Sequence, residues 1–142
     1  MIKMLLFFIF PFLTISCGEN NAETKVDGRW YTQSQVNSGR LVFEKNCAEC
    51  HGKNAQGTFS WTRKRADGSY PPPPLNGTAH TWHHSMKLLK RTINDGGIPL
   101  GGKMPGFKDK LTEKEKNEVI AFFQSQWSKK IYDAWAKRGG LN

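Results

Sequence analysis

The sequence lacks the features of a membrane-spanning, β-rich or multidomain protein. Its longest apolar run, Leu5 to Ile15, is too short to cross a bilayer and contains Pro11. No stretch alternates apolar and polar side chains as a half-buried strand does, and no segment repeats, so an all-α fold is expected. With 142 residues and a mean hydropathy of −0.61, the chain has room for one soluble domain and none for a second.

Acidic side chains are also scarce. The chain has 12 aspartates and glutamates against 21 lysines and arginines, which gives a formal net charge of +9. A basic surface attracts acidic protein patches, anionic lipid headgroups or nucleic acid. Because the basic residues are scattered and no nucleic-acid-binding motif surrounds them, no nucleic-acid partner is expected.

The first residues carry the pattern of an export signal. Lys3 precedes the apolar run, so residues 1–16 are interpreted as a signal peptide and set aside from the fold. The segment ends in LTISC at 13–17, which resembles the bacterial lipoprotein box, so Cys17 is predicted to carry lipid. The alternative is an ordinary signal peptide cut near Gly18, with Cys17 discarded. Both place the mature protein outside the cytoplasm, and the first anchors it to a membrane on the periplasmic or outer cell-surface side.

The rest of the chain divides into a tether and a domain. Residues 17–33 are interpreted as the lipidated N-terminus and a flexible tether, because the polar stretch 18–28 cannot bury enough surface to fold alone. The domain is expected over 34–142, with a C-terminal extension from about 128. This basic tail is expected to be solvated, and docking of a partner is the alternative.

The first predicted helix leads into the cysteine pair. Thr32 and Gln35 fit a capping box, and Val36, Gly39 and Phe43 follow at helical spacing. The next segment, 52–76, is rich in glycine, proline and basic residues and is predicted to be a loop.

Two more helices are predicted further along. One runs from Thr81 to a stop at Asp95-Gly96-Gly97, and the other begins at a second capping box, Thr112 with Glu115. Their apolar positions are Trp82, Met86, Leu89 and Ile93, then Val119, Phe122, Phe123, Trp127, Ile131 and Trp135. Three short helices make a poor core for about 100 residues. A flat apolar cofactor is therefore expected to fill the middle.

The stretch NCAECHGK at 46–53 suits three chemistries. Zinc needs four ligands, and Cys47, Cys50 and His51 supply three at most, so the fourth would come from His80, His83 or His84. A thioredoxin-like dithiol needs a βαβ context that is missing. Covalent haem uses all three residues, because the two thiols can bond one porphyrin while the histidine ligates its iron. With lipid on Cys17, no thiol is then left over.

The second axial face of the iron decides between a carrier and a catalyst. Met104 lies in a Gly- and Pro-rich segment outside any helical pattern and is the favoured ligand. Met86 is the competitor, but it falls on the apolar stripe of a predicted helix, where a methionine is more often core. The remaining rivals are His80, His83 and His84, one of which would lower the potential, whereas a His/Met pair raises it.

With these motifs in place, the sequence resembles a class I monohaem cytochrome c from about Ser34 to Trp127. Gly39 and Phe43 match the family's first-helix positions, which pack on the last helix, here at Val119 and Phe122. Two loops match as well, Pro74-Leu75-Asn76-Gly77 and Met104-Pro105-Gly106-Phe107. The resemblance implies a cytochrome c fold of three to four short helices and long loops wrapped around one covalently attached haem.

The resemblance also implies ligands and partners. His51 and Met104 would ligate the iron, and a proline carbonyl among Pro71 to Pro74, with Pro74 at the matching position, would accept a hydrogen bond from the histidine. A closed His/Met iron transfers electrons between membrane-associated or periplasmic redox proteins with acidic docking surfaces and catalyses no bond chemistry. The alternative is a haem enzyme or gas sensor with an open or exchangeable sixth position.

Overall fold

Helices make up the regular structure of residues 24–142, the part of the chain that this computed structural model describes. The predicted signal peptide and Cys17 lie outside these residues. The α-helices are α1 (Gln33–Asn46), α2 (Ala48–His51), α3 (Met86–Asp95), α4 (Glu113–Ser125) and α5 (Lys129–Lys137), and two short 3-10 helices are η1 (His80–His83) and η2 (Ile98–Leu100). Within the described residues there is no strand, only an isolated bridge between Lys25 and Thr32. The all-α prediction is confirmed.

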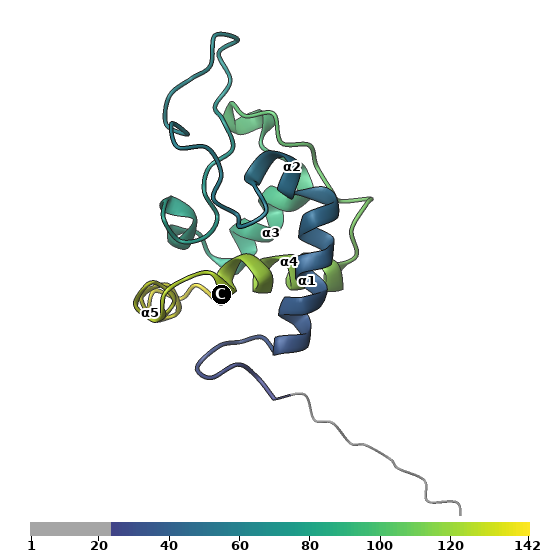
Figure 1. The fold of residues 1–142 in the computed structure, drawn as a ribbon, viewed down its shortest axis with the longest axis vertical. Helices are drawn as coiled ribbons and strands as arrows, with labels where there is room; N and C mark the ends of the chain where they lie inside the picture. The colour runs from purple at the N-terminus through teal and green to yellow at the C-terminus, as the bar shows by residue number, and fades with distance from the viewer. Residues whose placement is uncertain (1–23) are drawn as a thin grey trace, which may run out of the picture.

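Helix α1 begins where the capping box predicts and packs across α4 (Figure 1). The Thr32 hydroxyl accepts a hydrogen bond from the Gln35 amide at 3.2 Å, and the Gln35 side chain accepts one from the Thr32 amide at 2.9 Å. At the crossing, Gly39 lies against the backbone of Glu118, leaving no room for a Cβ atom. Beyond it the rings of Phe43 and Phe122 meet with centroids 5.0 Å apart. The predicted α1–α4 pairing is therefore present.

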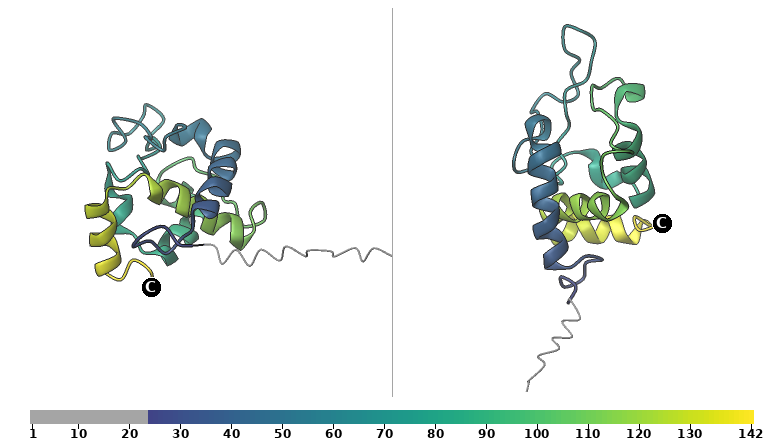
Figure 2. Two further views of the ribbon diagram at one scale, coloured as in Figure 1. Left: turned by 60° about the horizontal axis from the view of Figure 1, so that its bottom comes forward. Right: turned by 90° about the vertical axis from the view of Figure 1, so that its right-hand side faces the viewer.

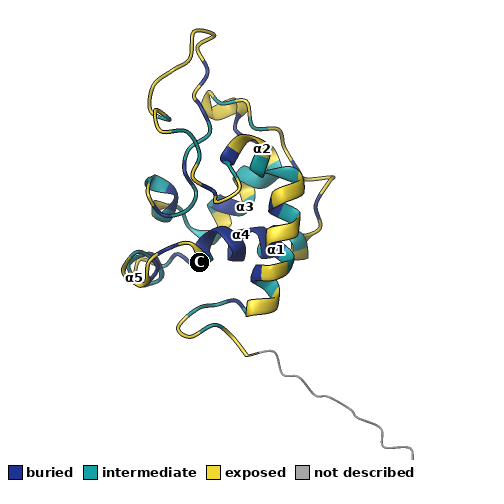
Figure 3. Cartoon of the chain, viewed as in Figure 1, coloured by how far each residue is buried: buried dark blue, intermediate teal, exposed yellow. Residues whose placement is uncertain are grey.

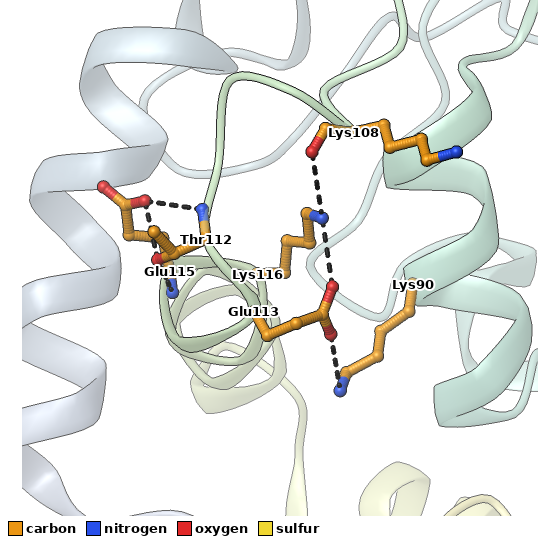
Figure 4. Close-up of polar contacts among 6 residues, drawn as sticks. All are labelled: Lys90, Lys108, Thr112, Glu113, Glu115 and Lys116. Atoms are coloured by element: carbon orange, nitrogen blue, oxygen red, sulfur yellow. Dashed lines mark hydrogen bonds and ion pairs between the residues drawn. The ribbon is translucent and has the colours of Figure 1, made fainter.

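The start of α4 is fixed on two sides (Figure 4). Thr112 and Glu115 form the second capping box, in which the Glu115 carboxylate accepts from the Thr112 amide at 2.8 Å. In the same turn, Glu113 pairs with Lys116 at 3.0 Å and with Lys90 of α3 at 3.4 Å. Since the Lys116 side chain is buried, the pair with Glu113 compensates part of the cost of desolvating its ammonium.

The helical pattern that runs on from α4 breaks at residues 126–128. Helix α4 ends at Ser125, and α5 begins with the Ser128 hydroxyl accepting from the Ile131 amide at 3.3 Å. Tyr132 and Trp135 of α5 are buried, and the Trp135 indole donates to the His84 carbonyl at 2.8 Å. The expectation of a single last helix followed by a solvated tail is wrong, because these two aromatic side chains pack on the core.

The middle helix begins later than expected. Trp82 lies in η1, and α3 starts at Met86 because Ser85 supplies an N-cap, its hydroxyl accepting from the Leu88 amide at 3.4 Å. The predicted stop is confirmed, since Gly96 adopts φ +81° directly after Asp95.

The core lies between α1, α3, α4 and α5, and the long loops after α2 and α3 extend from the side away from residues 24–32 (Figures 2 and 3). Its members are Tyr31, Val36, Phe43, Ala55, Leu89, Val119, Ile120, Ala121, Phe122, Phe123, Trp127, Tyr132 and Trp135. Among the described residues, none of the helices combines the length and the apolar character needed to cross a membrane.

Candidate functional site

Helix α2 is a single turn that presents the two cysteines and the histidine together. Cys47 ends α1, with its amide donating to the Phe43 carbonyl at 2.8 Å, and it also begins α2. The Cys47 carbonyl then accepts from the amides of Cys50 at 3.2 Å and His51 at 2.9 Å. Because residues three and four apart lie on one side of a helix, this turn gathers all three side chains.

The two thiols are free and differ in exposure. Cys50 is exposed, whereas Cys47 is half-buried and packs on the core. Burial, and to a smaller extent the neighbouring Cys50, raises the pKa of Cys47 to about 11, so this thiol is protonated at neutral pH. Across residues 24–142 there is no group of three histidine, cysteine or acidic side chains placed to hold a metal ion. His80, His83 and His84 therefore do not complete a zinc site with the cysteines.

His51 is buried and held in one orientation. Its Nδ1 lies 3.0 Å from the Pro73 carbonyl oxygen, which can only accept, so we assign the proton to Nδ1. Burial lowers the pKa of His51, and the hydrogen bond to Pro73 opposes that shift in part. The imidazole is therefore neutral at pH 7, with the Nε2 lone pair available to a metal.

The proline that meets His51 is Pro73, and the assignment of this bond to Pro74 is wrong. The Pro74 carbonyl is taken by another donor, the Thr81 hydroxyl, at 2.8 Å, and Thr81 is buried. Nearby, the indole of Trp127 donates to the Leu75 carbonyl at 2.8 Å. These two bonds secure the loop that orients the histidine, and neither Thr81 nor Trp127 carries a sequence pattern that predicts this role.

Met104 lies in a loop tied back to α3. Its carbonyl accepts from the Gly97 amide at 2.9 Å, and the Phe107 amide donates to the Ile93 carbonyl at 2.8 Å. The Met104 side chain is half-buried and is not among the described residues that pack on the core. Met86, by contrast, packs on the core, as expected for a filler of the apolar stripe.

A second set of contacts braces the Met104 loop from residues 67–70. The Lys103 ammonium pairs with the Asp67 carboxylate, which also accepts from the Ser69 amide at 2.9 Å. The Tyr70 amide donates to the Gly101 carbonyl at 2.8 Å. These hydrogen bonds to the aspartate, with the Lys103 contact the strongest, hold the pKa of Asp67 well below its usual range. Sequence reasoning missed this brace, because its members are far apart along the chain.

The other histidines pack among aromatic rings. His80 stacks on Trp61 with centroids 4.6 Å apart, and His84 meets His80 edge-on at 5.0 Å. Burial, and then the charge of neighbouring histidines, lowers the pKa of both rings. A cavity of about 230 Å³ beside them is lined by residues of η1 and of the C-terminal segment, and by none of Cys47, Cys50, His51 or Met104. These histidines belong to the packing around η1.

The residues of α2 fit covalently attached haem c better than a bare ion. A neutral imidazole with a free Nε2 suits haem iron, and two free thiols on the same helical turn suit attachment to one porphyrin.

Comparison with known proteins supports this assignment. The family model described as "Cytochrome C oxidase, cbb3-type, subunit III" matches residues 34–123, more than half of the chain. FixP, a cbb3-type cytochrome c oxidase subunit of Sinorhizobium medicae, is 29% identical over 112 residues, which are 75% of this chain and 35% of FixP. Cytochrome c-551 of Bacillus subtilis is 30% identical over 64 residues, which are 44% of this chain and 57% of that protein.

A third relative is named as a subunit of a dehydrogenase. The cytochrome c subunit of a quinone alcohol dehydrogenase from Gluconobacter oxydans is 29% identical over 100 residues, which are 66% of this chain and 19% of that subunit. The chain thus spans about a third of FixP and less than two thirds of the other two relatives. No solved structure matches the chain.

Proposed function

Because the chain belongs to the cytochrome c family, through a domain of the cbb3-type subunit III kind, we propose that it carries electrons on a haem held by His51 and Met104. Membership makes it a cytochrome c domain, whose chemistry is haem-based electron transfer. The observation that carries the finer proposal is His51, a buried neutral imidazole oriented by Pro73 one residue after the second thiol.

Each site residue has one task in this proposal. Haem c supplies a one-electron iron couple when it is bound. Cys47 and Cys50 would hold it on α2 through thioether bonds, and His51 would offer Nε2 to its iron. The Pro73 carbonyl holds the imidazole in one orientation and raises its basicity as a ligand.

The Met104 thioether would be the second protein ligand to the iron. A thioether raises the reduction potential relative to a second histidine. The ties of its loop to Gly97 and, through Lys103, to Asp67 limit how far the side chain can move between oxidation states. With both axial positions filled, substrates have no open site on the iron, so the protein acts as a carrier and not as an enzyme.

We further infer that the carrier works outside the cytoplasm beside a membrane. The support is the export pattern at 1–16 and the lipoprotein-like sequence at Cys17. Relatives by name include oxidase and dehydrogenase subunits as well as cytochrome c-551. The redox partner is accordingly another protein of a respiratory or dehydrogenase type, bound transiently or permanently.

Replacing Met104 by alanine tests the ligand set. We expect Met104→Ala to lose the sulfur-to-iron absorption band of the oxidised protein, to bind CO when reduced, and to lower the midpoint potential. Met86→Ala is the matched control and should keep the band while losing about 1–3 kcal/mol of stability from a half-buried side chain.

A wild type that binds CO readily, or a Met104→Ala protein with an unchanged spectrum, would show that the iron is open or held by another residue. His80, His83 and His84 would then be the candidates for the second ligand. An open or exchangeable position on the iron would favour an enzymatic or gas-sensing function.

A further inference from the structure

Two loops meet at the end of the molecule opposite residues 24–32 (Figures 1 and 2). One contains residues 58–70 and the other runs from η2 to Met104. The Tyr70 amide donates to the Gly101 carbonyl at 2.8 Å, and the Tyr70 ring lies over Gly101, where a Cβ atom would be 3.3 Å from its edge. Together with the Asp67–Lys103 pair, these contacts join the two loops into one surface.

This surface exposes several apolar side chains. Ile98 and Leu100 are each 68% exposed, and Tyr70 beside them is 40% exposed. The Lys64 ammonium lies 5.3 Å from the centre of the Tyr70 ring, which places the basic run Arg63-Lys64-Arg65 next to the apolar group. We call these six residues, Tyr70, Ile98, Leu100, Arg63, Lys64 and Arg65, the loop platform.

The loop platform and its surroundings carry a net positive charge. Segments 52–70 and 96–104 contain the cations Lys53, Arg63, Lys64, Arg65 and Lys103 and one carboxylate, Asp67. That carboxylate is already paired with Lys103, so it does not neutralise the arginines. Arg63, Lys64 and Arg65 are all exposed and make no ion pair within the described residues.

The loop platform is continuous with the proposed haem site. The carbonyl of Met104 is bonded to Gly97, the residue before Ile98. At the other side, the Thr58 amide donates to the Pro72 carbonyl at 2.9 Å, next to the proline that orients His51. Because electron transfer slows steeply with distance, a partner seated here would be well placed to exchange electrons with the haem.

We propose that the loop platform is the docking surface for a redox protein whose own surface has an apolar centre ringed by carboxylates. This proposal deepens the proposed function and rests on it. Apolar and aromatic side chains in the middle with arginine alongside are the composition of a protein interface. The cations steer an acidic partner into contact, and Ile98 and Leu100 are buried by it.

A protein partner fits the position of the platform better than a lipid surface does. Residues 24–32 lead toward Cys17, the proposed anchor, and they lie at the opposite end of the molecule from the platform (Figures 1 and 2). An anchor at the N-terminal end therefore does not by itself bring the platform against the membrane.

The test uses the haem-loaded protein with flavodoxin, an acidic flavoprotein, as a model partner. One electron passes from reduced flavodoxin to the ferric haem, so the flavin is oxidised as the iron is reduced. The triple variant Arg63→Glu, Lys64→Glu, Arg65→Glu is compared with Lys87→Glu, Lys130→Glu, Lys137→Glu. Both change the net charge equally, and the control lysines are exposed on α3 and α5. Leu100→Asp is compared with Leu141→Asp, since Leu141 is also exposed at 53%.

We expect the platform triple variant to lower the second-order rate at low salt by about tenfold or more relative to the control triple variant. Leu100→Asp should lower the rate at high salt, where steering is screened, and Leu141→Asp should not. The affinity for flavodoxin, measured by calorimetry, should fall more in the platform triple variant and in Leu100→Asp than in their respective controls. Equal losses in the platform and control variants would overturn the proposal.

Two further readouts separate the proposal from its rivals. The extent of reduction by the small reagent ascorbate and the absorption spectrum both report the haem site. Both should be unchanged in every variant. A wild type that ascorbate cannot reduce would contradict the proposed function, while the binding comparison would still decide the platform. Platform-dependent binding to vesicles of one part phosphatidylglycerol to three parts phosphatidylcholine, with no preference for flavodoxin, would overturn the platform as a protein-docking surface.

Discussion

At the scale of single residues, His51 and Thr81 bind the carbonyls of two successive prolines. Four consecutive prolines, Pro71 to Pro74, offer four similar carbonyl groups, and the sequence alone cannot choose among them. In the fold the Thr81 hydroxyl takes the carbonyl of Pro74, and His51 takes that of Pro73. The proline at the matching motif position therefore binds a residue of η1, which lies outside the motif, and the neighbouring proline orients His51.

Thr81→Val tests this arrangement. Valine keeps the shape but leaves the Pro74 carbonyl without its partner, so we expect a loss of about 1–3 kcal/mol in the free energy of unfolding. Urea titration measures it. Thr78→Val is the control, because Thr78 is exposed and its hydroxyl donates to the nearby Asn76 side chain, and it should change stability by less than about 0.5 kcal/mol. Equal effects of the two substitutions would contradict the role given to Thr81.

His80 and His84 make stability depend on pH. Burial lowers the pKa of both rings from the ordinary 6.5, so the unfolded chain takes up protons first as the pH falls. The free energy of unfolding should therefore keep the whole contribution of these two neutral rings above pH 6.5, and should decline as the pH drops below 6.5.

Thermal unfolding of the haem-loaded protein between about pH 7.5 and 5.5 measures this slope. The double variant His80→Gln, His84→Gln should reduce the dependence of stability on pH. His83→Gln alters an exposed ring and should leave most of that dependence in place. A slope that survives the double substitution would place the responsible groups elsewhere.

At the scale of helices, the sequence predicts where a helix begins better than it predicts where a helical pattern breaks. Both capping boxes begin helices at the expected residues, because their hydrogen bonds join side chains and amides within four consecutive residues. The break between α4 and α5 was missed because Trp127 and Ile131 continue the apolar spacing of α4 across it. Only the N-cap residue Ser128 marks the new helix, and Ser85 likewise marks the late start of α3.

Gly39→Ala probes the crossing of α1 and α4. A methyl group at this position would overlap the backbone of Glu118, so the helices must separate. We expect a loss of about 1–3 kcal/mol, against the small gain that alanine normally gives in a helix.

Chemical denaturation gives the value, with Asn37→Ala on the exposed face of α1 as the control. Stability equal to or above that of the control would mean that the crossing tolerates the methyl group. The close approach of the two helices would then not depend on glycine.

At the scale of the whole molecule, the two ends have different tasks in the proposed function. The end near residues 24–32 leads to the predicted anchor, and the far end carries the loop platform (Figure 1). A single acyl chain holds a protein only marginally at a membrane, whereas a multiply acylated cysteine holds it stably.

Cys17→Ser tests the anchor in cells that export the full chain. We expect the wild type in the membrane fraction, released by detergent and not by salt, and the variant in the soluble exported fraction. Mass spectrometry of the wild-type N-terminus should find an acylated Cys17. A mature chain that begins after Cys17 would instead support the ordinary signal peptide.

The pairing of α1 with α4 also affects the order in which the chain folds and its cysteines become covered. Most of the core lies at Val119 or beyond, so the first half of a growing chain has little to fold against. The long segment between the two helices must close into a loop before they can pair, at an entropic cost. Until then nothing covers Cys47, and both thiols are open to whatever machinery attaches the haem. Once α4 has docked, Cys47 rests on the finished core.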